Sequence, residues 1–308
     1  MMLLLGDGIA GFMNPGPETQ GEENHLSPSL SPAPSGGEGE DSCHNAVQGC
    51  HFCTEFGEFA PTVTPRSAAV LRIALLACSV FEREIALYTH GATHLAEIRF
   101  FEMGLHDRPD RLRATLQENL EEVSKRSDIE AVVLAYGLCG RGTAGLHPLR
   151  HRLVIPRAHD CITMFLGSKE AYAEHQRHCP TCYYYTPGWN RGRRVPGPDR
   201  LATMRTALAE KYDPDDVDYL VETEQQQWSM NDTAAFLELG TEDAQVEADY
   251  ARRCAKWLGW KFEHHRGNPA LLQDLLWGRW DQERFQIIEP GMKLGQAPDH
   301  TVLRAEPV

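Results

Sequence analysis

After residue 66 the sequence alternates between short apolar segments and longer segments with helical spacing, and this alternation constrains the fold more than any other feature. In residues 111–125, for example, Leu112, Leu116 and Leu120 recur along one face of a predicted helix. Similar spacing runs through residues 199–211, 242–258 and 269–277. The predicted strands are residues 72–77, 97–101, 131–135, 152–155, 219–221 and 285–288. Strands and helices in alternation predict an α/β fold with a mostly parallel, Rossmann-like sheet flanked by helices.

Residues 1–66 have a different composition, rich in Pro, Ser, Gly and Glu between positions 26 and 40. Such a segment buries too little apolar area to offset the entropy of ordering it, so we expect a disordered tail, or an extension translated from a misplaced start codon. It carries nine acidic residues and one arginine, a net of −8 of the formal −14. We therefore expect the folded domain, and the function, in residues 67–308.

Composition excludes several classes of protein. An acidic chain lacks the basic surface of a general nucleic-acid binder, and no run of about 18 apolar residues predicts a membrane span. The first five residues have no basic flank and make a poor signal peptide. The nine cysteines are too few and too irregularly spaced for a disulfide scaffold. We therefore expect a cytoplasmic protein, in which cysteines serve as metal ligands, reactive thiols or core residues.

Three predicted strands each end in a turn that carries a cysteine. Cys78 follows the first strand, Cys139 follows strand 131–135, and His159 and Cys161 follow strand 152–155. Parallel strands present their carboxyl ends at one edge of a sheet, where open α/β sheets bind ligands. Three thiolates and an imidazole are the ligands of a tetrahedral zinc site, and three thiolates alone suit a [4Fe-4S] cluster with one open iron. Zinc would take His159 as its fourth ligand, whereas a cluster would leave His159 free as a catalytic acid or base.

Other residues near these turns are candidates for ligand binding. Gly137 and Gly140 permit close approach of the backbone to a ligand, although their spacing matches no phosphate-binding fingerprint. Arg141 and Arg157 are placed to pair with a carboxylate or phosphate, with Arg157 a candidate catalytic residue. An exposed arginine or a structural ion pair is the competing interpretation for both.

The aromatic run at residues 183–189 predicts a strand and a turn. Tyr185 and Trp189 are its candidates for lining a cofactor pocket, against the simpler role of covering apolar surface. Just before it, Cys179 and Cys182 have the spacing of a redox pair or of half a zinc knuckle, whose partner pair would be in residues 50–53. Incidental cysteines are the third possibility, so this pair is left without an assigned role.

Several separated motifs resemble one known family. They are Tyr136-Gly-Leu-Cys-Gly140, Pro156-Arg-Ala-His-Asp-Cys161, Tyr184-Tyr-Thr-Pro-Gly-Trp189 and Glu289-Pro-Gly-Met-Lys293. Over about residues 70–293 the chain resembles the bacterial and archaeal family called domain of unknown function 1638. Because family members are often encoded near corrinoid methyltransferase systems, the resemblance implies one-carbon or methyl-group metabolism. The chain departs from the family pattern at Cys179 and Cys182, which puts a family-wide role for this pair in doubt.

Two functional hypotheses follow. In the first, the protein is an enzyme that acts on a small thiol, methyl or one-carbon substrate through a Cys/His metal site, because a bound metal turns a substrate thiol into a thiolate. The cofactor is then zinc or, alternatively, a [4Fe-4S] cluster. In the second, the protein is a non-catalytic accessory protein that handles a metal, a corrinoid or a methylated ligand for a corrinoid protein or methyltransferase partner.

Overall fold

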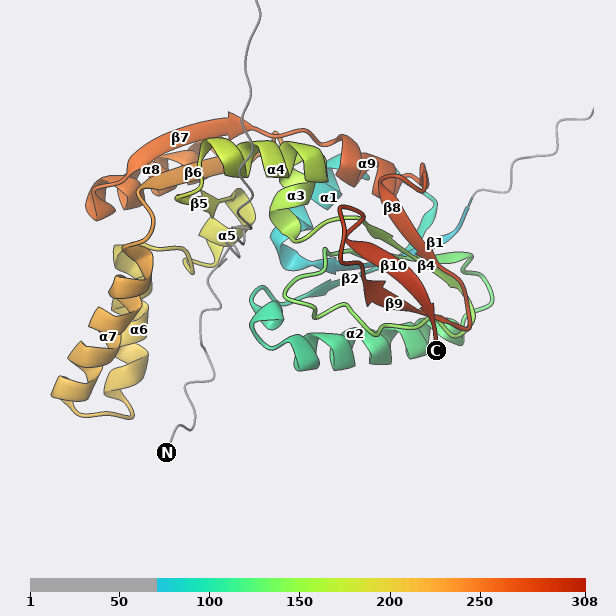
Figure 1. Ribbon diagram of the computed structural model, residues 1–308, viewed down its shortest axis with the longest axis horizontal. Helices are drawn as coiled ribbons and strands as arrows, with labels where there is room; N and C mark the ends of the chain where they lie inside the picture. Colours follow the sequence, from blue (N-terminus) through green and yellow to red (C-terminus); the bar gives the residue numbers. More distant parts are fainter. Residues whose placement is uncertain (1–70) are drawn as a thin grey trace, which may run out of the picture. The chain divides into compact units, whose positions relative to one another are not determined.

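The computed structural model describes residues 71–308, and the predicted tail at residues 1–66 lies outside the described residues. The fold is α/β, as the alternation predicted (Figure 1). A five-stranded sheet has the order β2-β1-β3-β4-β8. Its strands are β1 (Ile73–Cys78), β2 (Leu95–Phe101), β3 (Ala131–Ala135), β4 (Arg152–Pro156) and β8 (Phe285–Ile288). The pairs β1–β2, β1–β3 and β3–β4 are parallel, and only β8 runs antiparallel, against β4.

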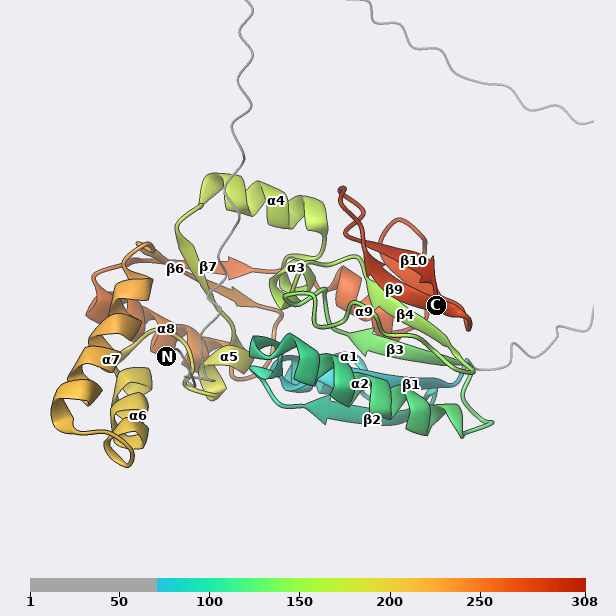
Figure 2. The same cartoon turned by 60° about the horizontal axis from the view of Figure 1, so that its bottom comes forward.

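Apolar strands and helices hold this sheet together. Every residue of β1 and β3 is buried, as expected of central parallel strands covered on both faces. Helix α2 (Pro109–Ser124) buries Leu112, Leu116 and Leu120 in the same core as the two strands. Helices α2 and α9 (Ala270–Leu276) lie on opposite sides of the sheet (Figures 1 and 2). The short helices that follow β1 are η1 (Ser79–Phe81, 3₁₀) and α1 (Glu82–Tyr88), and the 3₁₀ helix η2 (Leu105–Asp107) follows β2.

A second parallel sheet, which the sequence patterns did not predict as a separate unit, has the order β5-β6-β7. Its strands are β5 (Cys182–Tyr185), β6 (Thr233–Glu238) and β7 (Lys261–Arg266). Its core is formed with helix α8 (Ala244–Leu258), which lies against β6 and β7. The neighbouring helices are α3 (Cys161–Leu166), α4 (Lys169–His178), α5 (Pro187–Arg191), α6 (Pro198–Ala209) and α7 (Pro214–Trp228). The antiparallel pair β9 (Met292–Gln296) and β10 (Leu303–Pro307) follows β8 in the chain.

The strand predicted at residues 219–221 is wrong, because these residues lie within α7. Val217, Val221 and Trp228 are buried along one side of that helix, whereas Tyr219 is 68% exposed. The apolar residues that suggested a strand therefore belong to a helix with one buried face. No helix of residues 71–308 combines the length and the apolar character needed to cross a bilayer.

Candidate functional site

The three strand-end cysteines lie at one edge of the five-stranded sheet. Cys78 is the last residue of β1, Cys139 lies in the loop after β3, and Cys161 is the first residue of α3, which follows β4. Strand register aligns these ends, since Ala77 pairs with Ala135 across the parallel β1–β3 ladder. Each of the three thiols interacts electrostatically with the other two. The fold thus brings together the cysteines that the sequence placed at strand ends.

The backbone of the Cys139 loop is tied to the turn that carries Cys161. The Leu138 amide donates to the carbonyl oxygen of Ala158 at 2.8 Å, and the Cys139 amide donates to that of His159 at 2.9 Å. Gly137 makes this approach possible, because a Cβ atom there would lie 2.6 Å from the backbone nitrogen of Asp160. The absence of a side chain at Gly137 therefore allows these two backbone segments to lie in contact.

Three consecutive residues of this loop have left-handed backbone angles. The φ values are 45° at Cys139, 60° at Gly140 and 69° at Arg141. Non-glycine residues adopt such angles rarely, and strained backbone of this kind clusters at functional sites. Arg141 itself is exposed, while the side chain of Cys139 is partly buried.

Two polar groups next to the thiols were not singled out by the sequence. The Tyr136 hydroxyl is buried and interacts with the thiols of Cys78 and Cys139. Asp160, only 8% exposed, caps α3 by accepting hydrogen bonds from the amides of Ile162 (2.9 Å) and Thr163 (3.2 Å). The sequence feature that could have indicated Asp160 is its position directly before a helix, which is typical of an N-cap residue.

Asp160 occupies the position relative to the thiols that the sequence analysis assigned to His159. The Asp160 carboxylate interacts electrostatically with Cys139 and Cys161, and burial raises its pKa to about 6. His159 is exposed, and its ring lies near the ring of Tyr172, with centroids 6.0 Å apart.

Of the predicted aromatic residues, Trp189 lies at the thiols and Tyr185 does not. The indole nitrogen of Trp189 donates to the sulfur of Cys161 at 3.5 Å. Gly188 lets α5 approach η1, since a Cβ atom there would overlap the carbonyl oxygen of Val80. Tyr185 is fully buried in the core of the second sheet, where its hydroxyl donates to the carbonyl oxygen of Pro196 at 2.8 Å.

Arg157 has a structural role in place of the predicted pairing with a carboxylate or phosphate. Its guanidinium donates to the carbonyl oxygens of Gln282 (3.0 Å), Thr301 (3.0 Å) and Leu303. A further hydrogen bond of 2.8 Å goes to the amide oxygen of Gln286. These bonds tie the end of β4 to the C-terminal segment, and they occupy the donors that a ligand would need.

The thiols themselves are sheltered from water. Cys78 and Cys161 are 7% and 8% exposed, and Cys139 is partly exposed. Burial raises the pKa of Cys78 to about 11 and also raises those of Cys139 and Cys161. Thiols in such surroundings become thiolates only when a cation binds them.

The spacing of the three sulfurs distinguishes between the metal centres considered. Two groups of His, Cys or carboxylate side chains in residues 71–308 have all their ligand atoms within 4.8 Å of one another, and neither contains a strand-end cysteine. A single zinc ion, with Zn–S bonds of about 2.3 Å, separates its sulfurs by about 3.8 Å. The three sulfurs are therefore more widely spaced than a single zinc ion requires.

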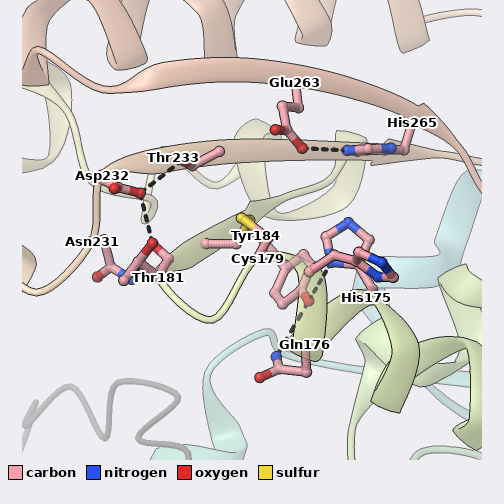
Figure 3. Close-up of a disulfide and its surroundings, with 12 residues drawn as sticks. His175, Gln176, Cys179, Thr181, Tyr184, Asn231, Asp232, Thr233, Glu263 and His265 are labelled. Atoms are coloured by element: carbon pink, nitrogen blue, oxygen red, sulfur yellow. Dashed lines mark hydrogen bonds and ion pairs between the residues drawn. A yellow bond between two sulfur atoms is a disulfide. The ribbon is translucent and has the colours of Figure 1, made fainter. Parts of the chain in front are cut away.

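The two groups with closely spaced ligand atoms lie elsewhere in the fold. One consists of His175, Glu263 and His265, and the other of Cys179, Cys182 and the same Glu263. Cys179 and Cys182 form a disulfide (Figure 3). The partner pair that a zinc knuckle would need, at residues 50–53, lies outside the described residues. Sequence analysis missed the histidines and Glu263, because helix α4 and strand β7 are distant in sequence.

A family described as "Protein of unknown function (DUF1638)" matches residues 100–276, more than half of the chain. The chain belongs to this family. The matched region of this DUF1638 protein contains Cys139, Cys161 and both closely spaced ligand groups, whereas Cys78 precedes it. Comparison with curated proteins and with solved structures gave no match.

Proposed function

We propose that Cys78, Cys139 and Cys161 bind a metal–thiolate centre at which the protein acts on a small thiol, methyl or one-carbon substrate. The observation that carries this proposal is the convergence of three thiols from three parallel strand ends. Isolated buried cysteines are common core residues. Three that interact with one another around a strained loop and a buried tyrosine hydroxyl have no comparable structural explanation.

A [4Fe-4S] cluster fits this arrangement better than one zinc ion does. The sulfurs are spread too widely for a single tetrahedral ion, while a cluster brings its own iron and sulfide atoms and spans a wider set of thiolates. His159, the expected fourth zinc ligand, is exposed, whereas Cys78 and Cys161 are buried. Three cysteine ligands leave one iron of a cluster with an open position for a substrate atom.

The surrounding residues would orient such a centre and its ligand. The Trp189 indole N–H already donates to Cys161, and hydrogen bonds of this kind adjust the charge on ligand sulfurs. The buried Tyr136 hydroxyl interacts with Cys78 and would donate to that sulfur, or to a ligand bound beside it. The partly exposed Cys139 marks the side from which a small molecule can enter. When bound, an open iron supplies a Lewis acid that lowers the pKa of a substrate thiol.

The test is elemental analysis of protein purified without oxygen. We expect about four irons with acid-labile sulfide per chain, and a broad visible absorption. Cys139→Ser should lose most of the iron, whereas Cys254→Ser, at a buried position in α8, serves as the matched control and should retain it.

His159→Ala distinguishes the two metals. We expect the variant to keep its cluster, because a cluster held by three cysteines does not use the imidazole as a ligand. About one zinc per chain that is lost in His159→Ala would instead favour a zinc site with three cysteines and one histidine. Metal-free protein in which all three thiols are rapidly alkylated in the native state would refute the proposal.

A further inference from the structure

A second set of ligand side chains surrounds the disulfide between α4 and β5. The ligand atoms of His175, Glu263 and His265 lie within 4.8 Å of one another, and so do those of Cys179, Cys182 and Glu263. Glu263 belongs to both groups, so an ion bound to its carboxylate can take its other ligands either from the imidazoles or from the sulfurs. Figure 3 shows Glu263 and His265 near the His175 ring and the disulfide.

Regular secondary structure accounts for this convergence. His175 lies in the last turn of α4, and Cys179 is the C-cap residue, whose amide donates to the carbonyl oxygen of His175 at 2.9 Å. Glu263 and His265 are two residues apart on β7, and therefore share a face of the strand. The intervening residue, His264, points the other way, and its ring contacts Phe236 with centroids 5.2 Å apart.

Neighbouring groups hold the imidazoles in place. Nδ1 of His175 is 2.9 Å from the Tyr184 hydroxyl, an arrangement that leaves Nε2 available to a metal. Nε2 of His265 lies 2.9 Å from the Glu263 carboxylate, and the two imidazole rings meet edge to face with centroids 5.0 Å apart. A hydrogen-bonded second nitrogen is the usual companion of a metal-binding histidine.

The chemistry of the donors indicates the ion. Two imidazoles and a carboxylate form a common set for zinc and for other divalent transition metals, and two thiolates with a carboxylate also suit zinc. Disulfide sulfurs carry no charge and are poor ligands. The oxidised pair thus leaves a nitrogen–oxygen site, and the reduced pair adds two thiolates.

We propose that His175, Glu263, His265, Cys179 and Cys182 form a second metal site, distinct from the three-cysteine centre, which binds Zn²⁺ most tightly when the cysteine pair is reduced. A cellular dithiol would reduce the disulfide by thiol–disulfide exchange, giving it two electrons and two protons while the dithiol becomes a disulfide itself. Zinc binding then displaces the two thiol protons. Oxidation of the pair, with a disulfide as electron acceptor, reverses these steps and releases the ion.

The test measures Zn²⁺ affinity of the full chain, by competition with a chromogenic chelator, before and after reduction and anaerobic removal of the reductant. We expect reduction to tighten binding at least tenfold. Glu263→Gln should weaken binding at least tenfold in both states, because its carboxylate is common to both ligand groups. His264→Ala is the matched control on the same strand and should bind like the wild type.

The double variant Cys179→Ser/Cys182→Ser separates the redox effect from the histidine site. We expect it to bind Zn²⁺ as the oxidised wild type does, whatever the redox conditions. With Co²⁺ as the probe, reduced wild type should show thiolate-to-cobalt charge-transfer absorption that the double variant lacks, and the difference spectrum excludes any signal from the other thiols. Equal affinity in both redox states, or a Glu263→Gln variant that binds like the wild type, would overturn the proposal.

Discussion

Glu84 offers a direct test of how burial controls charge in this fold. It lies in the first turn of α1 with no exposed surface, and neither carboxyl oxygen has a hydrogen-bond partner of good geometry among the described residues. Arg191 and Arg83 are nearby, but both pair with Asp243, at 2.9 Å and 3.0 Å. Burial therefore dominates and raises the pKa of Glu84 from 4.5 to about 7.

The sign of the effect follows from proton linkage. Between these two pKa values the unfolded chain has released the proton and the folded chain still holds it, so stability decreases as pH rises from about 4.5 to about 7. Between about pH 5 and about pH 8 the carboxyl lowers the free energy of unfolding by about 2 to 3 kcal/mol. Glu84→Gln removes the titrating carboxyl group, and the variant should therefore not show this decrease in the free energy of unfolding as the pH rises.

The assay is urea denaturation of wild type and Glu84→Gln at both pH values. We expect the stability of the variant relative to wild type to rise by about 2 to 3 kcal/mol from the lower pH to the higher. Burying the new side-chain amide also changes the free energy of unfolding, but this change is the same at both pH values. It therefore cancels when the difference between the two pH values is taken. Glu82→Gln, at an exposed position in the same helical turn, controls for the change in charge. A relative stability of Glu84→Gln that does not change with pH would refute the reasoning.

Three further predictions concern packing and the proposed centre. Gly188→Ala should destabilise the fold by about 1 to 3 kcal/mol or more in urea denaturation, because the new methyl group overlaps the carbonyl oxygen of Val80; unchanged stability would show that α5 can shift freely. Leu116→Ala should cost about 2 to 5 kcal/mol, because the side chain is fully buried between α2 and the sheet; a cost below about 1 kcal/mol would contradict the packing described. Trp189→Phe should lower the reduction potential of a cluster in a spectroelectrochemical titration, since it removes the N–H donor to the Cys161 sulfur; an unchanged potential would show that this hydrogen bond is absent from the loaded protein.

The sequence by itself determined the layers of the main sheet. Strands β1 and β3 are continuous apolar runs because both of their faces are covered, and α2 shows its buried side as a helical repeat. These patterns depend only on local burial, so they can be read along the chain. Parallel pairing then placed Cys78, Cys139 and Cys161 at one edge, as the alternation of strands and helices predicted.

The local sequence pattern was insufficient to predict elements that are short or largely exposed. Strand β7 has mostly charged and histidine residues and was missed, because it is an edge strand of the second sheet and none of its residues is fully buried. The apolar run at Tyr219 was assigned to a strand, although it belongs to a helix whose buried side is defined by more distant residues. Three residues are too few to distinguish the two periodicities.

Only the tertiary structure decided which side chains face each other. His159 and Asp160 are neighbours in the chain, yet Asp160 is buried, caps α3 and interacts with the thiols, whereas His159 is exposed. His175 approaches Glu263 because α4 and β7 pack together, and no spacing within either segment indicates that contact. The chain sequence specifies which ligand types are present, whereas packing between distant elements sets their distances and directions, on which metal binding depends.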